Sequence, residues 1–200
     1  MLSSRKKEIR IEADSFRGNC KVGQYGIIDL FMECERCKYK LLRYPLGERA
    51  DLGFALRRDT DIIIFTNTSS RLSREIFTLA HEIGHVILHL KDTVSFMDDA
   101  VTISEKNADE KEQEANYFAA CLLMPVDMVD KVLDLEIADF MKNRLTAMDI
   151  ARIMSEFGVS FDTALNRLEN LGKIDSAEKL RLDNERNQIR VGNLLKSVGG

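Results

Sequence analysis

The chain has 200 residues, 44% of them hydrophobic, and a formal net charge of −4 at pH 7. This is enough apolar material for one globular domain with a small appended one, and the weak negative charge gives no electrostatic reason to expect nonspecific nucleic-acid binding. No apolar run is long enough to span a membrane, and the first twenty residues are too polar for a signal-peptide core. Four cysteines without an export signal favour reduced thiols, so we expect a cytoplasmic protein with no membrane association.

Two packing helices are predicted near the start of the chain. Apolar residues at helical spacing indicate the first, which Gly18 and Asn19 can end, and the second runs from about residue 26 to 38. The second contains Cys34 and Cys37, a C-x-x-C spacing that occurs in zinc and redox sites. Because the chain has no second such pair and no spare histidine to complete a site, plain buried or half-buried thiols are the preferred interpretation.

Residues 39–66 have the pattern of a small antiparallel sheet. Three short apolar stretches are separated by turn residues, and the last of them, Ile62 to Phe65, has the continuous apolar run of a strand covered on both faces. A sheet edge beside an active-site helix could hold an extended peptide through its backbone. The alternative is a sheet that only supports the helix.

The spacing of apolar residues over 71–90 predicts an amphipathic helix, with an apolar stripe on one side and the candidate catalytic and metal-binding side chains on the other. His81, Glu82 and His85 form the pattern H-E-x-x-H, in which two imidazoles one helical turn apart can converge on one metal ion. The glutamate beside the first histidine can then act on a water molecule as a general base. This spacing is typical of zinc metalloproteases, and His89, one turn further on, is expected at the rim of the site or in contact with a ligand rather than as a ligand itself.

A catalytic zinc usually takes three protein ligands, so a third must come from elsewhere. A helix predicted over residues 105–124, stopped by Pro125, places Glu112 on a stripe of mostly small residues that suits close packing. A carboxylate on a packed face is costly unless it is paired or bound to a cation, so Glu112 is either the third ligand or a salt-bridged structural residue. Glu114 is expected to face solvent.

Residues 146–174 predict two helices around Gly158, with apolar residues able to form a shared core, as in a helix-turn-helix. A DNA-reading second helix should be basic, but this one carries Arg167 against Asp162 and Glu169. Direct DNA binding is therefore not expected, and a structural or partner-docking helical pair is preferred.

Two stretches of the chain resemble the ImmA/IrrE family of metallopeptidases: FTLAHEIGHVILH and, some twenty residues later, EQEANYFAACLLMP. The resemblance implies a zincin-like core with His81, His85 and Glu112 as ligands of Zn²⁺. It also implies that Glu82 is the catalytic glutamate and that Asn116 orients a ligand. Tyr117, a neighbour of the ligand stripe, is a candidate for stabilising the oxyanion.

The resemblance further implies a substrate, a helix-turn-helix transcriptional repressor whose cleavage releases a mobile element or a stress response. The sequence as a whole predicts a mainly helical α+β fold, with a metallopeptidase domain over residues 1–140 and a helical segment with a tail over residues 141–200. The alternative function is a non-catalytic, zinc-containing regulatory module that binds a transcription factor. A structural zinc usually has four protein ligands, and no obvious fourth is present, which favours the enzyme.

Overall fold

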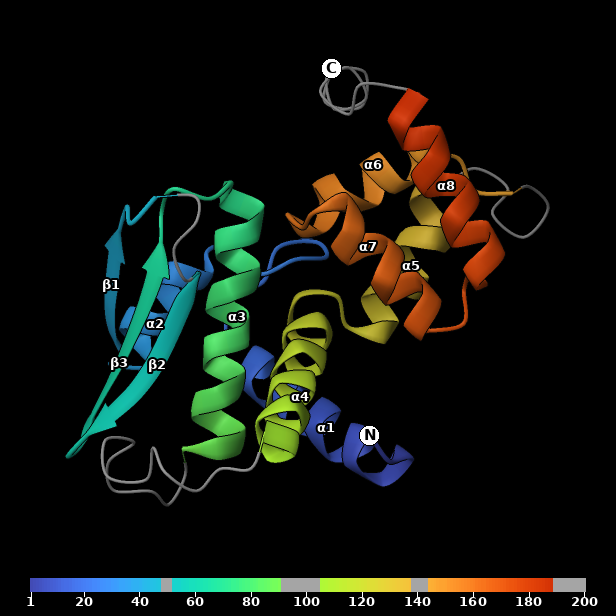
Figure 1. Ribbon diagram of the computed structural model, residues 1–200. Helices are drawn as coiled ribbons and strands as arrows, with labels where there is room; N and C mark the ends of the chain where they lie inside the picture. Colours follow the sequence, from blue (N-terminus) through green and yellow to red (C-terminus); the bar gives the residue numbers. More distant parts are fainter. Residues whose placement is uncertain (48–51, 91–104, 138–143, 189–200) are drawn as a thin grey trace. The chain divides into compact units, whose positions relative to one another are not determined.

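The computed structural model describes residues 1–47, 52–90, 105–137 and 144–188. The chain forms two compact units, one of Met1–Gly23 with Ile27–Leu123 and the other of Gln24–Gly26 with Met124–Gly200. The predicted α+β class with a mainly helical chain is confirmed (Figure 1). Among the described residues, no helix is both long and apolar enough to cross a membrane.

The first unit is layered around one central helix, α3 (Leu72–His89). A three-stranded sheet lies against one side of α3 and helix α4 lies against the other, with α1 packed on α4 (Figure 1). Leu79, Ile83 and Val86 of α3 are buried, as the predicted stripe requires. The other elements of the unit are α1 (Ser3–Gly18), α2 (Leu30–Arg36), β1 (Lys40–Tyr44), β2 (Gly53–Arg58), β3 (Asp61–Asn67) and α4 (Glu105–Leu123).

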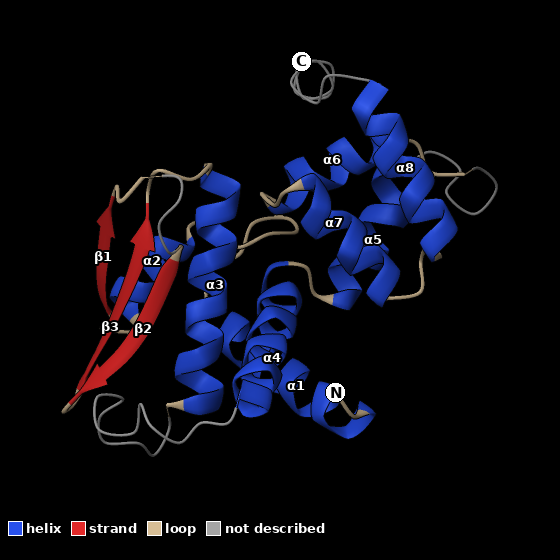
Figure 2. Ribbon diagram, viewed as in Figure 1, coloured by secondary structure: helices blue, strands red, loops and turns tan. Residues whose placement is uncertain are grey.

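The sheet is mixed rather than antiparallel, which corrects the prediction. Its order is β1-β3-β2, with β3 antiparallel to β2 but parallel to β1 (Figure 2). A simple meander would place β2 in the centre, but β3 is the most apolar strand and takes the position that is covered on both edges and most of both faces. The local pattern identified three strands, whereas their order depends on which strand most needs burial. Strand β2 is consequently an edge strand on the side of α3.

Gly84 allows α3 and α4 to approach closely. A β-carbon built at this position would lie 3.1 and 3.2 Å from atoms of the Phe118 ring and side chain and 3.3 Å from the α-carbon of Ala115. Each of these contacts is tighter than an ordinary side-chain contact, so the helix spacing depends on the missing side chain. The close approach brings the polar faces of the two helices together near His81 and His85.

The described residues of the second unit form four helices, labelled α5 to α8 in Figure 2. Helices α6 and α7 meet at Gly158, whose φ of 66° is left-handed, and Ser160 caps α7 through its side chain. The predicted core of this pair is confirmed, because Ile150 and Leu168 are completely buried. The helices are α5 (Val126–Glu136), α6 (Ala147–Phe157), α7 (Phe161–Asn170) and α8 (Ser176–Gln188).

Two features of the second unit were not visible in the sequence pattern. The structure groups α5 with the C-terminal helices, whereas the sequence placed the boundary after residue 140; the independent folding of either part stays a prediction. Helix α8 has little apolar periodicity, but Arg181 forms ion pairs with Glu178 and Glu185 along one side of it. Such pairs at three- and four-residue spacing stabilise a helix that the apolar pattern alone does not predict.

Candidate metal centre

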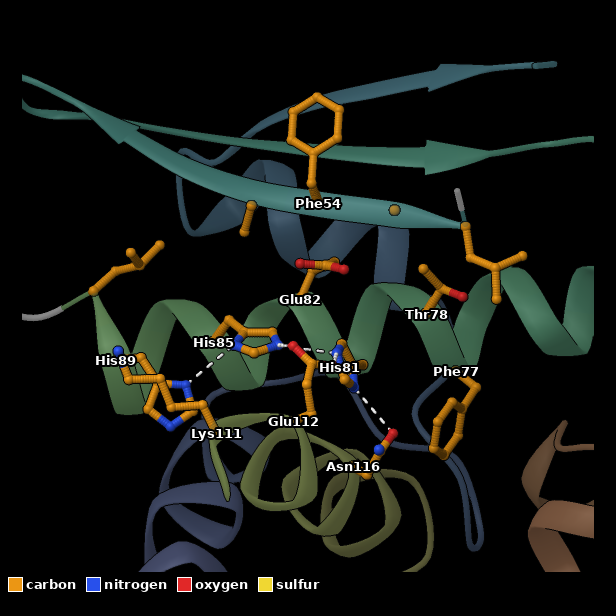
Figure 3. A pocket seen from close by; sticks show the side chains of 14 residues that line it. Phe54, Phe77, Thr78, His81, Glu82, His85, His89, Lys111, Glu112 and Asn116 are labelled. Carbon is orange, nitrogen blue, oxygen red and sulfur yellow. Dashed lines mark hydrogen bonds and ion pairs between the residues drawn. The ribbon is translucent and has the colours of Figure 1, made fainter. Parts of the chain in front are cut away.

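His81, His85 and Glu112 converge on one point between α3 and α4. The Nε2 atoms of His81 and His85 are 2.9 Å apart. One oxygen of the Glu112 carboxylate lies 3.1 Å from Nε2 of His81, and the other oxygen lies 3.1 Å from Nε2 of His85. Figure 3 shows the carboxylate between the two rings, reaching up from α4. All three potential ligand atoms therefore lie around one small volume.

This donor set suits zinc. Two ligand atoms that bind one zinc at about 2.0–2.1 Å in tetrahedral geometry are about 3.3 Å apart, close to the separations of 2.9 and 3.1 Å found here. When neither Nε2 carries a proton, the two imidazole lone pairs repel one another at this distance unless a cation lies between them. In the described part of the chain these three residues are the one group of histidine, cysteine and acidic side chains whose ligand atoms are this close. They leave a fourth position of a tetrahedral ion without a protein ligand.

The ring of His81 has an amide partner. Asn116 of α4 places its Oδ1 3.0 Å from Nδ1 of His81. Because an amide oxygen only accepts hydrogen bonds, Nδ1 of His81 must carry the proton and its Nε2 keeps the lone pair. The expected orienting position of Asn116 is thus present in the geometry (Figure 3).

The ring of His85 has a different partner. Nδ1 of His85 lies 3.1 Å from Nδ1 of His89, whose Nε2 lies 3.2 Å from a carboxylate oxygen of Glu114. Glu114 is also bound by Arg5 of α1, through Nε at 2.8 Å and Nη2 at 2.6 Å. The expectation that Glu114 faces solvent is wrong, because its side chain is only 17% exposed and α1 covers it. Helical spacing within α4 could not reveal a partner on α1.

The pKa values of His85 and Glu114 are shifted by their surroundings. Burial, helped by the neighbouring rings of His81 and His89, lowers the pKa of His85 to about 3. The imidazole of His85 is therefore neutral near pH 7, as a metal ligand must be. The hydrogen bonds from Arg5 lower the pKa of Glu114 and keep its carboxylate charged.

Glu82 of α3 lines the same pocket as His81 and His85, and its carboxyl group points toward strand β2, as Figure 3 shows. It is 6% exposed, and burial, with a smaller effect of the Glu112 charge, raises its pKa to about 7. A carboxyl group that titrates near neutral pH can both take up and release a proton. Gly53 makes room for it, since a β-carbon there would lie 2.6 Å from the Thr78 methyl group and 3.3 Å from Glu82 Oε1.

A pocket of about 540 Å³ opens over these residues. Strand β2 forms one wall through Gly53, Phe54 and Ala55, and the two helices form the other. Since β2 is an edge strand, one side of its backbone is not used within the sheet. The remaining lining residues are Leu52, Phe77, Thr78, His81, Glu82, His85, His89, Leu90, Lys111, Glu112 and Asn116.

Two expectations about individual side chains need correction. Glu112 does not lie on a packed face, because its side chain is 57% exposed at the rim of the pocket, where it meets the two histidines. Tyr117 does not line the pocket; its ring lies beside Lys6 of α1. On a helix Tyr117 is about 140° away from Glu112, so proximity in sequence was misleading. Tyr117 is therefore not among the residues that line the pocket.

The C-x-x-C pair is not part of this centre. Cys34 is completely buried in α2, and burial raises its pKa to about 12, whereas Cys37 is exposed. Both are free thiols. The expectation of a buried or half-buried thiol is thus confirmed for Cys34 and wrong for Cys37.

The family model for peptidase M78, described as the IrrE N-terminal-like domain, matches residues 34–169. The match includes helices α3 and α4, the sheet, and the α6–α7 pair except for the last residue of α7. The chain belongs to this family. The resemblance to ImmA/IrrE proteins is thereby confirmed, and with it a metallopeptidase-type fold for the IrrE-like chain. No match to this chain is found among curated proteins.

Among solved structures, a Mycobacterium tuberculosis transcriptional regulator resembles this chain with a TM-score of 0.53 and 16% sequence identity. The similarity covers 84% of this chain but 47% of the regulator, so the chain spans about half the length of that protein. At this identity the likeness concerns the fold.

Sequence reasoning missed two contributors to the site. Gly53, which lets β2 pass over Glu82, is one glycine among eleven and carries no motif. Arg5, which binds Glu114, is 109 residues away from it in the chain. Neither contact leaves a local signal, although the four-residue spacing of His85 and His89 did indicate that those two rings would be neighbours.

Proposed function

We propose that this chain is a zinc-dependent endopeptidase. The observation that carries the proposal is the convergence of His81, His85 and Glu112 around one point in an open pocket, with Glu82 beside them. Three ligands from two imidazoles and a carboxylate, with a further position left open, are typical of catalytic zinc sites rather than structural ones. Membership of the IrrE N-terminal-like family supports the same reading of the site.

In this proposal each side chain has a separate task. His81, His85 and Glu112 would hold a zinc ion, which would supply Lewis acidity toward the scissile carbonyl and the attacking water. Glu82 takes a proton from that water as its oxygen bonds to the carbonyl carbon, and it later delivers a proton to the amine when the C–N bond breaks. Asn116 accepts a hydrogen bond from Nδ1 of His81 and would thereby leave the Nε2 of that ring free to bind the ion.

Strand β2 is proposed to hold the substrate. It is an edge strand of the sheet, and Gly53, Phe54 and Ala55 lie along one wall of the pocket. An extended peptide that pairs with this edge would pass directly over Glu82 and the ligands. Side chains at alternate positions of the peptide would then point into the pocket, which gives the backbone pairing some sequence preference.

The substrate that we propose is a helix-turn-helix transcriptional repressor in the cytoplasm. This assignment comes from the family resemblance. The similar solved structure is a transcriptional regulator, which is compatible with a role in the control of transcription. Direct DNA binding by the chain itself is not part of the proposal. The one basic side chain of α7, Arg167, is 1% exposed and so is not available to a phosphate backbone.

The test is cleavage of a purified helix-turn-helix repressor, chosen from genes that neighbour the gene of this chain, followed by mass spectrometry of the fragments. The zinc-loaded parent, Glu82→Gln and Glu110→Gln are compared at equal zinc content. Glu110 is exposed on α4 and controls for the loss of one negative charge. We expect one defined cut with the parent and with Glu110→Gln, and none with Glu82→Gln.

Cutting at the same bond by Glu82→Gln would show that Glu82 is not the base. An intact repressor that nevertheless co-elutes with both the parent and Glu82→Gln at full zinc occupancy would instead support the non-catalytic regulatory module.

A further inference from the structure

We propose that His89 and Glu114 are positioning residues that fix His85 as an Nε2 ligand, and that Arg5 anchors this chain of hydrogen bonds from helix α1. The inference rests on the metal site proposed above. It assigns a role to the third histidine of the chain, which is not itself a ligand, and it makes the N-terminal helix part of the metal centre.

The direction of each hydrogen bond follows from Glu114. A charged carboxylate only accepts, so Nε2 of His89 must donate to Glu114 across their 3.2 Å contact. Nδ1 of a neutral His89 is then an acceptor, and Nδ1 of His85 must donate to it across 3.1 Å. This leaves Nε2 of His85 without a proton and with its lone pair toward His81 and Glu112.

His89 lies on the side of His85 that faces away from the ligand cluster. Its contact with His85 joins the two Nδ1 atoms, whereas the contacts of His85 with His81 and Glu112 are made through Nε2 (Figure 3). Since a single His85 ring separates His89 from the point where the ligand atoms meet, His89 cannot share that point. The third histidine is therefore a partner of a ligand.

Arg5 completes the chain from a distant part of the sequence. It binds both oxygens of Glu114, which leaves the carboxylate in one orientation with one oxygen toward His89. The side chains of His89 and Glu114 are 6% and 17% exposed, so water competes little for their contact. A carboxylate that acts on a metal-binding imidazole increases its basicity and fixes its ring, and here the effect passes through a second imidazole.

The two ligand histidines are thus oriented differently. His81 has a neutral partner, Asn116, while His85 has a partner that is connected to a full negative charge. Removing that charge should therefore weaken zinc binding through His85 alone and leave the contact between His81 and Asn116 unchanged. This difference separates a positioning role from a general effect of charge or of folding.

The test is zinc affinity, measured by competition with a chromophoric chelator. We compare the parent with Glu114→Gln and with the matched control Glu110→Gln, which removes a charge from an exposed position of the same helix. Glu114→Gln should weaken zinc binding by roughly ten- to a hundredfold, and Glu110→Gln by less than about threefold. Unfolding of the metal-free proteins checks that both variants fold.

Three further variants test the order of the hydrogen bonds. His89→Asn keeps an oxygen near the position of Nδ1 and should bind zinc more tightly than His89→Ala, although less tightly than the parent. Arg5→Met should weaken binding by roughly fivefold or less, because Arg5 is 35% exposed and acts through Glu114. The absorption spectrum of the cobalt(II) form should keep its band positions in all of these variants, since the ligands themselves are unchanged.

Each failure has its own signature. A parent that binds no zinc defeats the metal site itself, and a parent that binds zinc without hydrolysing any repressor defeats only the proposed activity. Zinc affinity of Glu114→Gln equal to that of the parent would overturn the positioning role. A cobalt spectrum changed by His89→Asn would overturn it as well, because His89 would then be a ligand.

Discussion

The seam between α3 and α4 and the α6–α7 pair are both helix–helix contacts, but they are built differently. The α6–α7 pair is held by completely buried apolar side chains such as Ile150 and Leu168, joined through a short turn. The α3–α4 seam has an apolar part around Gly84 and a polar part where His81 and Glu112 meet. The α6–α7 contact is stabilised mainly by apolar packing, whereas part of the α3–α4 contact consists of the polar side chains of the proposed metal site. Stability and metal affinity should therefore respond to different mutations.

The largest effect on stability is expected in the helical pair. Leu168→Ala removes a completely buried side chain and should reduce the free energy of unfolding by about 2–5 kcal/mol, measured by urea denaturation. Leu180→Ala in α8 is the control, because that side chain is 63% exposed and its loss should cost little. Zinc affinity of folded Leu168→Ala should equal that of the parent; a tenfold loss would show that the two regions are not separable in this way.

The opposite result is expected at the seam. Glu112→Gln removes one ligand and should weaken zinc binding by about a hundredfold, since a four-ligand site worth about 10–16 kcal/mol gives roughly 3 kcal/mol per ligand. The metal-free protein should unfold at the same urea concentration as the parent, because Glu112 is 57% exposed. Calorimetric titration with zinc measures the first quantity. Unchanged affinity would remove Glu112 from the ligand set.

The same contrast explains what could be predicted from the sequence. In the α6–α7 pair every important contact joins residues close in the chain, so apolar spacing and Gly158 were enough to place both helices. On α3 the spacing of His81 and His85 was equally local. Glu112 could be placed on a helix, but its exposure and the burial of Glu114 depended on where α1 lies. The parallel pairing of β1 with β3 and the contact of Arg5 with Glu114 join distant segments, and no local pattern encodes them.

A polar contact outside the metal site tests whether the first unit as a whole is sensitive to charge. Glu75 is buried and accepts hydrogen bonds from Arg43 at 2.7 and 2.9 Å and from Thr66 at 2.9 Å. The bonds from Arg43 lower the pKa of Glu75, so its contribution to stability is complete above the unfolded value of about 4.3 and is lost as the pH falls through the folded value.

Glu75→Gln should therefore cost about 1–2 kcal/mol at pH 7, and its stability should fall less steeply than that of the parent as the pH drops below about 5. Glu35→Gln, at an exposed position, is the control. Urea denaturation across this pH range measures both effects. Parallel pH profiles for the parent and Glu75→Gln would contradict the assignment.

The smallest effect is expected at Gly84. Alanine gains about 0.5–1 kcal/mol in helix propensity, but its methyl group would be forced against Phe118 and Ala115, at a cost of about 1–3 kcal/mol. Gly84→Ala should therefore be less stable than the parent by about 1 kcal/mol, as thermal unfolding can measure. Gly18→Ala, where nothing lies within 4 Å, should not be destabilised by crowding. A gain in stability for Gly84→Ala would show that the seam is looser than described.

The central claim is that two imidazoles and one carboxylate bind a single zinc ion and leave one position open. X-ray absorption at the zinc edge of the loaded protein tests this most directly. The account predicts a shell of nitrogen and oxygen ligands at about 2.0–2.1 Å that includes two imidazoles and no sulfur. A sulfur ligand at about 2.3 Å, or a third imidazole from His89, would contradict it.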